Sequence, residues 1–297
     1  MKRFTDSIIN IIIKFLEIIS SVMKFRLRGK VAGFVGSVVF IFARERKKVA
    51  LKNLQLSFPD KQKIWFSRIS HKAFQNIAIT FFELLAQRKI RRDAVSEQIR
   101  YENLELITEA YNRGKGVILL SGHYGNWELL ALSAGLFTGI PVLVVVQKQK
   151  FWDRQITEAR TRFGNSVVER GSAARKLVAA LKNKGMVALL ADQSPPERDG
   201  IYVDFFSRRT LTYRAPAELA LKFGAAVIAG FAVREKDYTY SVVLEEVIHE
   251  GLEYNEAGIK EFTQRYSALI ERKISEHPHL WAWQHKRWKK TPELNDY

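Results

Sequence analysis

Short apolar runs alternate with amphipathic stretches from residue 116 onward, and this alternation constrains the fold more than any other feature. Val117–Ser121, Pro141–Val146 and Met186–Ala191 are strand-length apolar runs, and the segments between them have helical spacing. Such alternation is typical of a mostly parallel sheet flanked by helices, so we predict an α/β fold. Further strands are expected at 167–168 and 225–232, with a half-exposed edge strand at 238–245, where Tyr238, Tyr240, Val242 and Leu244 alternate with other residues. Helices are expected over 127–136, 152–163, 172–182 (N-capped by Ser172), 215–223 and 258–275.

Residues 44–113 have a mainly helical pattern, and a helical extension precedes them. Residues 7–25 are apolar but include Lys14 and Glu17. The next apolar run, Val31–Phe42, is shorter than the roughly 20 residues that a membrane-spanning helix needs. The first 50 residues contain eleven basic and three acidic residues, which favours a helix lying on an anionic membrane surface. A buried N-terminal helix is the alternative. We divide the chain into a membrane-associating segment, residues 1–43, and one domain, residues 44–297.

Charge and cysteine content narrow the possible functions. Lys and Arg number 48 against 31 Asp and Glu, a net charge of +17, which predicts an anionic partner such as nucleic acid, an acidic membrane or an acidic protein. The absence of cysteine excludes a thiol nucleophile and Cys-ligated metal centres. Residues 278–290 interleave three tryptophans with basic residues, as membrane interfaces and single-stranded nucleic-acid sites do. No nucleic-acid module is recognisable, so a non-catalytic RNA-binding or adaptor protein is the less favoured interpretation.

The segment SGHYGNWE, residues 121–128, follows an expected strand and opens an expected helix. Ligands bind at the carboxyl ends of strands in α/β sheets. His123 would project from a glycine-rich turn, and Glu128 in the first helical turn would accept the hydrogen of one ring nitrogen. That arrangement makes His123 a general base for a hydroxyl or amine that the substrate brings. Alternatively, His123 caps the turn and Glu128 complements the helix dipole.

Two further strand ends and one loop offer binding residues. Arg170 precedes a helix N-terminus, where it would hold a phosphate or carboxylate, or simply be solvated. Asp192 follows Met186–Ala191 and would orient Arg170, bind a sugar hydroxyl or cap the loop. Arg208 and Arg209 adjoin two phenylalanines, so this loop would contact an acyl chain and an anion together. No spacing predicts a metal site.

These residues resemble a known family. The segment GHYGNWE fits the His-x₄-Asp/Glu motif of the glycerolipid acyltransferase superfamily, and the chain resembles the lipid A biosynthesis acyltransferases of the lauroyl/myristoyl type. The resemblance covers roughly residues 40–290 and includes Arg46–Pro59, Arg170, Ala191-Asp192-Gln193 and the Pro278…Trp283…His285-Lys286-Arg287-Trp288-Lys289 ending. The Phe-Pro-Glu-Gly-Thr motif of the glycerol-phosphate branch is absent, which argues against a simple lysophosphatidate acyltransferase.

The resemblance implies an enzyme at the cytosolic face of the inner membrane, in a glycerolipid acyltransferase-like fold. It would transfer an acyl chain from acyl carrier protein to a hydroxyacyl chain of a phosphorylated saccharolipid, the lipid A precursor, with no metal or cofactor. His123 would be the base and Glu128 its orienting acid. Asn126 would belong to a substrate-binding turn whose backbone N–H groups stabilise the oxyanion, and Arg170 with Asp192 would hold a phosphate. Another glycolipid, an aminolipid or a lysophospholipid is the alternative acceptor.

Overall fold

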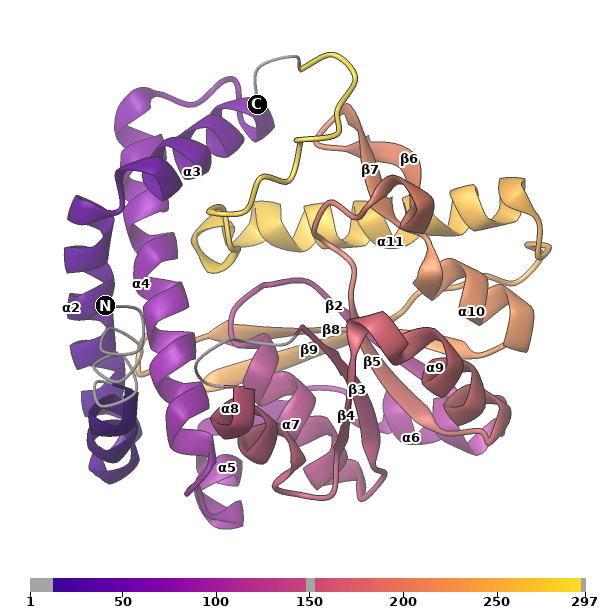
Figure 1. Ribbon diagram of the computed structural model, residues 1–297, viewed down its shortest axis with the longest axis horizontal. Coiled ribbons are helices and arrows are strands. Elements are labelled where there is room, and N and C mark those ends of the chain that lie inside the picture. Colours follow the sequence, from indigo (N-terminus) through magenta and orange to yellow (C-terminus); the bar gives the residue numbers. More distant parts are fainter. Residues whose placement is uncertain (1–12, 148–152, 295–297) are drawn as a thin grey trace, which may run out of the picture.

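The computed structural model describes residues 13–147 and 153–294 and places a seven-stranded sheet at the centre (Figure 1). The strand order is β1-β9-β8-β2-β5-β3-β4, and every pair of neighbours is parallel except β8 and β9. The predicted α/β fold with a mostly parallel sheet is confirmed. The strands are β1 (Ile99–Tyr101), β2 (Val117–Ser121), β3 (Val142–Val146), β4 (Ser166–Glu169), β5 (Met186–Leu190), β8 (Ala226–Arg234) and β9 (Tyr240–Glu246), with β6 (Gly200–Phe205) and β7 (Arg208–Tyr213) forming a separate hairpin.

Helices cover both faces of the sheet. Because side chains alternate along a strand, β2 directs Ile118 and Leu120 into one hydrophobic core, and Val117 and Leu119 towards the other. The first core includes side chains of α9, α10 and α11, and the second those of α5, α6 and α7. The helices are α2 (Phe25–Phe42), α3 (Arg44–Ser57), α4 (Lys63–Gln87), α5 (Arg92–Gln98), α6 (Glu105–Asn112), α7 (Trp127–Thr138), α8 (Asp153–Thr161), α9 (Ala173–Lys182), α10 (Ala215–Phe223) and α11 (Glu256–Glu276).

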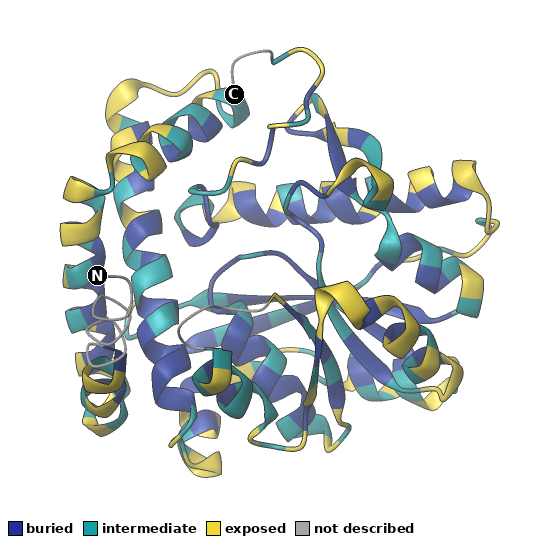
Figure 2. Cartoon of the chain, in the orientation of Figure 1, coloured by how far each residue is buried: buried dark blue, intermediate teal, exposed yellow. Residues whose placement is uncertain are grey.

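Helix α2 lies along α4 (Figure 1) and buries Gly29, Ala32, Gly33 and Gly36 together with Arg28. A Cβ on Gly36 would lie 2.6 Å from the Cα of Gln75, so glycine is needed for this approach. Phe34 and Phe42 are 70% and 76% exposed, and Figure 2 shows exposed residues of α2 on the side of the helix turned away from α4. In residues 13–147 and 153–294, no helix is both long and apolar enough to cross a bilayer. Residues 1–12 of the predicted membrane-associating segment lie outside the described residues.

The structure differs from the sequence prediction around β1 and β9. Ile99–Tyr101, in a stretch predicted to be helical, forms β1 and pairs with β9. The segment 238–245 is predicted to be a half-exposed edge strand. Tyr240, Val242 and Leu244 are buried and the residues between them are partly exposed, as the alternation predicts, but β9 is not at the edge because it lies between β1 and β8. Ser172 occupies the N-cap position of α9 but makes no capping hydrogen bond with its side chain; its hydroxyl donates to the carbonyl of Glu169.

The expected loop around Phe205 and Phe206 is the β6–β7 hairpin. Phe206 and Ser207 form its two-residue turn, with φ of 52° and 55°, as a twisted hairpin requires. The hairpin packs against the C-terminal segment, residues 278–291, and the ring of Phe205 lies 5.8 Å from that of Trp281.

The C-terminal segment is an internal part of the fold. Its three tryptophans, Trp281, Trp283 and Trp288, are at most 2% exposed, and the guanidinium of Arg287 donates to the carbonyl of Leu211 at 2.6 Å. The prediction that these aromatic residues face a membrane or a nucleic acid is therefore wrong. The tryptophans are buried here because the hairpin packs against their rings and its backbone carbonyl accepts the hydrogen bond of Arg287.

Candidate active site

His123 lies in the turn between β2 and α7, at the carboxyl end of the sheet. Gly125 in the same turn has φ of 56°, and a Cβ there would lie 1.6 Å from the carbonyl oxygen of Ala232 on β8. Only glycine lets the turn approach β8 this closely. The side chain of His123 is 24% exposed, so the imidazole is held by the fold but accessible from outside.

Asp192 is the direct partner of His123. The Nδ1 of His123 lies 2.8 Å from Asp192 Oδ1, and the backbone N–H of His123 donates to Asp192 Oδ2 at 2.8 Å. The indole N–H of Trp281 donates to the same Oδ2 at 2.7 Å. Because Nδ1 faces a carboxylate, Nε2 is the ring nitrogen that can accept a proton from a substrate.

The two side chains shift each other's pKa. Burial alone would raise the pKa of the Asp192 carboxyl, but the charge and hydrogen bonds of His123, together with Trp281, lower it to about 2. Burial of His123 disfavours its charged form, yet the Asp192 carboxylate outweighs this and raises the pKa of the imidazole. An aspartate that stabilises an imidazolium also makes the neutral imidazole a stronger base.

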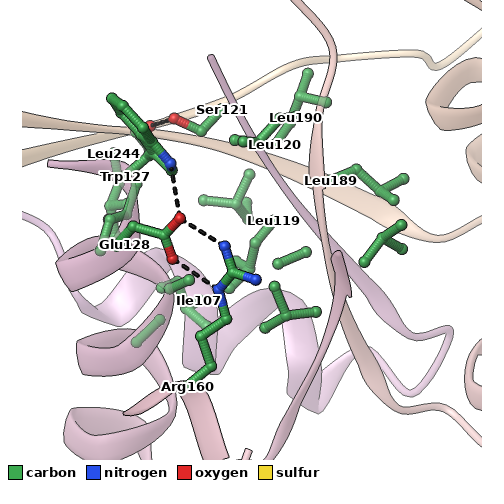
Figure 3. A pocket seen from close by; sticks show the side chains of 18 residues that line it. Ile107, Leu119, Leu120, Ser121, Trp127, Glu128, Arg160, Leu189, Leu190 and Leu244 are labelled. Carbon is green, nitrogen blue, oxygen red and sulfur yellow. Dashed lines mark hydrogen bonds and ion pairs between the residues drawn. The ribbon is translucent and has the colours of Figure 1, made fainter. Parts of the chain in front are cut away.

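Glu128, predicted to orient His123, makes a different contact. Its carboxylate accepts hydrogen bonds from Arg160 Nε and Nη2 at 2.7 and 2.6 Å, and from the indole of Trp127 at 3.0 Å (Figure 3). The hydrogen bond that we predicted between Glu128 and the ring of His123 is made by Asp192 instead. Glu128 faces α8 from the first turn of α7, whereas Asp192 follows β5, the strand beside β2.

The ion pair between Glu128 and Arg160 is almost buried, with side-chain exposures of 9% and 16%. Burial would raise the pKa of Glu128, but the guanidinium of Arg160 lowers it. The negative charge of Glu128 in turn favours the protonated form of His123 without a hydrogen bond between them. Arg160 is a site residue that no sequence motif predicted, but its position on the helix indicates that it faces the protein interior. Arg160 stands four residues after the buried Ile156, and thus on the apolar face of its helix.

The side chain of Asn126 is used inside the fold. It is fully buried, and its Oδ1 caps α7 by accepting the N–H of Leu129 at 2.9 Å. Its Nδ2 donates to Glu83 on α4 at 2.6 Å, and Glu83 also accepts the hydroxyl hydrogen of Tyr240 at 2.5 Å. This network fixes the turn to α4 and β9, so the structure gives Asn126 a supporting role in place of the predicted contact with substrate.

Most backbone N–H groups predicted to stabilise an oxyanion already have acceptors. The N–H of His123 donates to Asp192, that of Tyr124 to the carbonyl of Gly122 at 2.8 Å, and that of Gly125 to the carbonyl of Leu280 at 2.9 Å. These three groups hold the turn together. The prediction that they bind the reacting oxygen is therefore not supported by the geometry.

The three predicted arginines do not join His123. Arg170 pairs with Asp199 at 3.4 Å, not with Asp192 as expected, because Asp192 is already engaged with His123. The side chain of Arg208 donates to a backbone carbonyl of α3 at 3.2 Å, and Arg209 lies 5.1 Å from the centre of the Tyr202 ring. Their binding roles stay predictions.

An apolar cavity lies beside this turn, between the sheet and α7. Its polar end is formed by Glu128, Arg160 and Trp127 (Figure 3), and the ring of Trp127 lies 5.2 Å from that of His123. A cavity with apolar walls and a few convergent polar groups suits a hydrocarbon chain with a polar head. The walls include Ile107, Leu119, Leu130, Ala131, Ala134, Val144, Val145, Ala188, Leu189, Ile228, Gly230 and Leu244.

Comparison with known proteins identifies the family of this chain. The family model for bacterial lipid A biosynthesis acyltransferases matches residues 2–290. The lipid A biosynthesis palmitoleoyltransferase of Escherichia coli is 22% identical over 259 residues, which cover 87% of this chain and 83% of that protein. A lipid A biosynthesis acyltransferase of Haemophilus influenzae is 26% identical over 73% of this chain and 69% of its own. A phosphatidylinositol mannoside acyltransferase of Mycolicibacterium smegmatis is 25% identical, over 65% of this chain and 64% of its own.

These matches show that the chain is an acyltransferase. The chain belongs to the bacterial lipid A biosynthesis acyltransferase family.

Proposed function

We propose that this protein transfers a fatty acyl chain from the thioester of acyl carrier protein to a hydroxyl of a hydroxyacyl chain on a lipid A precursor. The observation that carries the proposal is the contact of His123 Nδ1 with the buried carboxylate of Asp192. This contact aims Nε2 at the substrate, and the apolar cavity begins at the neighbouring Trp127. A base and an apolar cavity therefore lie next to each other.

The reaction uses His123 as both base and acid. Nε2 removes the proton of the acceptor hydroxyl while its oxygen attacks the thioester carbonyl. The Asp192 carboxylate stabilises the imidazolium that forms. Collapse of the tetrahedral intermediate breaks the carbon–sulfur bond, and the imidazolium returns its proton to the departing thiolate. The products are the acyl ester and the carrier thiol, with His123 neutral again.

Glu128 and Arg160 act at the polar end of the cavity. The two side chains form hydrogen bonds with each other beside the apolar wall of the cavity. An unpaired charge at that place would destabilise the protein by roughly 3–5 kcal/mol. In this proposal the pair positions the head of the acyl chain near His123, and Glu128 supports the imidazolium by its charge.

A different glycolipid is the second candidate acceptor. The similarity to a phosphatidylinositol mannoside acyltransferase supports it, because that relative's name states a mannosylated lipid instead of lipid A. The residues around His123 would serve either hydroxyl in the same way, and the two candidates differ only in the acceptor.

The protein would work on the cytosolic face of the inner membrane. Helix α2 supports this proposal by exposing Phe34 and Phe42, and the net charge of +17 suits anionic lipid, a phosphorylated acceptor and an acidic carrier protein. The large apolar side chains on the outer face of α2 would enter the headgroup layer while α4 holds its inner face.

The test is acyl transfer by purified protein in detergent micelles, with acyl carrier protein thioester as donor and a lipid A precursor or a mannosylated phospholipid as acceptor. We expect His123→Gln to lose activity by at least about 100-fold, the scale of a general base. His277→Gln, at an exposed histidine, is the matched control and should keep full activity. Undiminished transfer by His123→Gln would refute the mechanism.

A further inference from the structure

The C-terminal segment runs alongside the turn that carries the proposed base. The N–H of Gly125 donates to the carbonyl of Leu280 at 2.9 Å, and the N–H of Ala282 donates to the carbonyl of His123 at 3.0 Å. One of these bonds is made by His123 itself and the other by the residue two positions after it. The C-terminal segment therefore holds the backbone of His123 in place directly.

Trp281 adds a contact that reaches the carboxylate itself. Its indole N–H donates to Asp192 Oδ2 at 2.7 Å, and its side chain is 2% exposed. The same oxygen accepts the backbone N–H of His123, while Oδ1 faces the imidazole. All three hydrogen bonds of this carboxylate thus come from the turn and the C-terminal segment.

We propose that Trp281 is a positioning residue that fixes the Asp192 carboxylate and tunes how strongly it holds the proton on His123. The proposal rests on the proposed function only in taking His123 to be the base of acyl transfer; the contact between Trp281 and Asp192 is independent of it. A carboxylate that accepts a further N–H donor shares its negative charge with that donor, so it stabilises a neighbouring cation less. Removal of the indole N–H therefore strengthens the remaining interaction with the imidazolium.

Trp281→Phe removes the donor while keeping an aromatic ring. That ring packs edge-on against Trp283 at 4.6 Å and lies 5.8 Å from Phe205. Trp283→Phe is the matched control. Trp283 is also fully buried in the same segment, but its indole N–H donates to the carbonyl of Pro278 at 2.6 Å. Both variants lose one indole and one buried hydrogen bond, and only one of them alters Asp192.

The measurement is an NMR titration of the full chain, labelled with ¹³C-histidine in detergent micelles. The resonance of His123 is assigned by its disappearance in His123→Gln. We expect Trp281→Phe to raise the pKa of His123 by about half a unit or more, a scale set by charge-assisted hydrogen bonds. Trp283→Phe should leave it unchanged. An unchanged or lower pKa in Trp281→Phe, or an equal rise in both variants, would overturn the proposal.

A second measurement compares the unsubstituted chain with Trp281→Phe after fluorotryptophan incorporation. Fluorotryptophan has a more acidic N–H, and Trp127 donates to Glu128 in both proteins, so it should lower the pKa of His123 by more in the unsubstituted chain; an equal change in both proteins, or a rise, would contradict the proposal. Neither titration depends on acyl transfer. If no acceptor is acylated, the proposed function fails while the titrations still decide the role of Trp281. If transfer is observed, the acid limb of its pH profile should move upward in Trp281→Phe only.

Discussion

Asp192→Asn tests whether Asp192, which contacts His123 in the structure, supports the base in place of Glu128, which the sequence predicted for that role. The pKa of Asp192 is about 2 instead of 3.8, which corresponds to about 2 kcal/mol of favourable interaction for the ionised form. If the imidazolium loses this interaction in the transition state, the rate falls roughly 30-fold. The amide oxygen can still accept the two N–H groups that point at Oδ2, but the NH₂ group then donates to Nδ1 of His123 and leaves the ring proton on Nε2, the tautomer that cannot act as the base, so the rate falls by at least this factor.

The pH profile gives the sign of the effect. His123 must be neutral to act as a base, so kcat/KM rises with pH through the pKa of His123 in the unliganded enzyme. Asp192 raises that pKa above its ordinary 6.5. Asp192→Asn should therefore move the acid limb to lower pH and lower the plateau at high pH. The assay is acyl transfer in detergent micelles between pH 5 and 9, read by mass spectrometry of the product lipid.

Glu128→Gln is the comparison variant. Its charge favours the imidazolium, but it makes no direct hydrogen bond to His123 in the described structure. We expect the acid limb to move in the same direction by less than in Asp192→Asn. If Glu128→Gln moves it further, Glu128 orients His123 in solution, and the assignment of that role to Asp192 is refuted.

Three further predictions test the surroundings of the site. Arg160→Met leaves the buried carboxylate of Glu128 without its bidentate partner and should destabilise the protein by about 3–5 kcal/mol; an unchanged Tm in thermal unfolding would contradict this. Ala134→Phe fills part of the apolar cavity, so competition between acyl donors of different length should shift towards shorter chains, and an unchanged product distribution would show that the chain lies elsewhere. Phe34→Ser combined with Phe42→Ser should weaken binding to anionic vesicles at least tenfold, since each exposed ring contributes about 2 kcal/mol when buried in lipid, with Tm unaffected; equal cosedimentation would argue against α2 as the contact.

The turn that carries His123 could be predicted because its determinants are local. An apolar strand, a turn with two glycines and a helix follow one another over residues 117–136, and each can be predicted from neighbouring residues. The partner of His123 could not be predicted in this way. Glu128 is near in sequence, whereas Asp192 is 69 residues away. Their proximity depends on β5 lying between β2 and β3, and strand order is a property of the whole sheet.

The C-terminal tryptophans illustrate a second limit. Aromatic and basic residues in alternation have the same local pattern at a membrane interface and in a buried aromatic cluster. What decides between them here is the β6–β7 hairpin, whose Phe205 and Phe206 pack against the tryptophan rings. The sequence pattern predicts a loop in place of that hairpin, because Phe206 and Ser207 occupy its turn at positive φ, where glycine or asparagine is usual.

The pairing of Ser121 with Leu190 in adjacent parallel strands dictates where the chain tolerates insertions and deletions. One residue added or removed within β2 or β5 would shift its strand by about 3.3 Å and turn the following side chain to the opposite face, which would separate His123 from Asp192. The surface loops between β2 and β5, which connect α7, α8 and α9 to the strands, can change in length without shifting the register of β2 against β5. Length variation among homologous chains should accumulate there, with both strands kept at constant length.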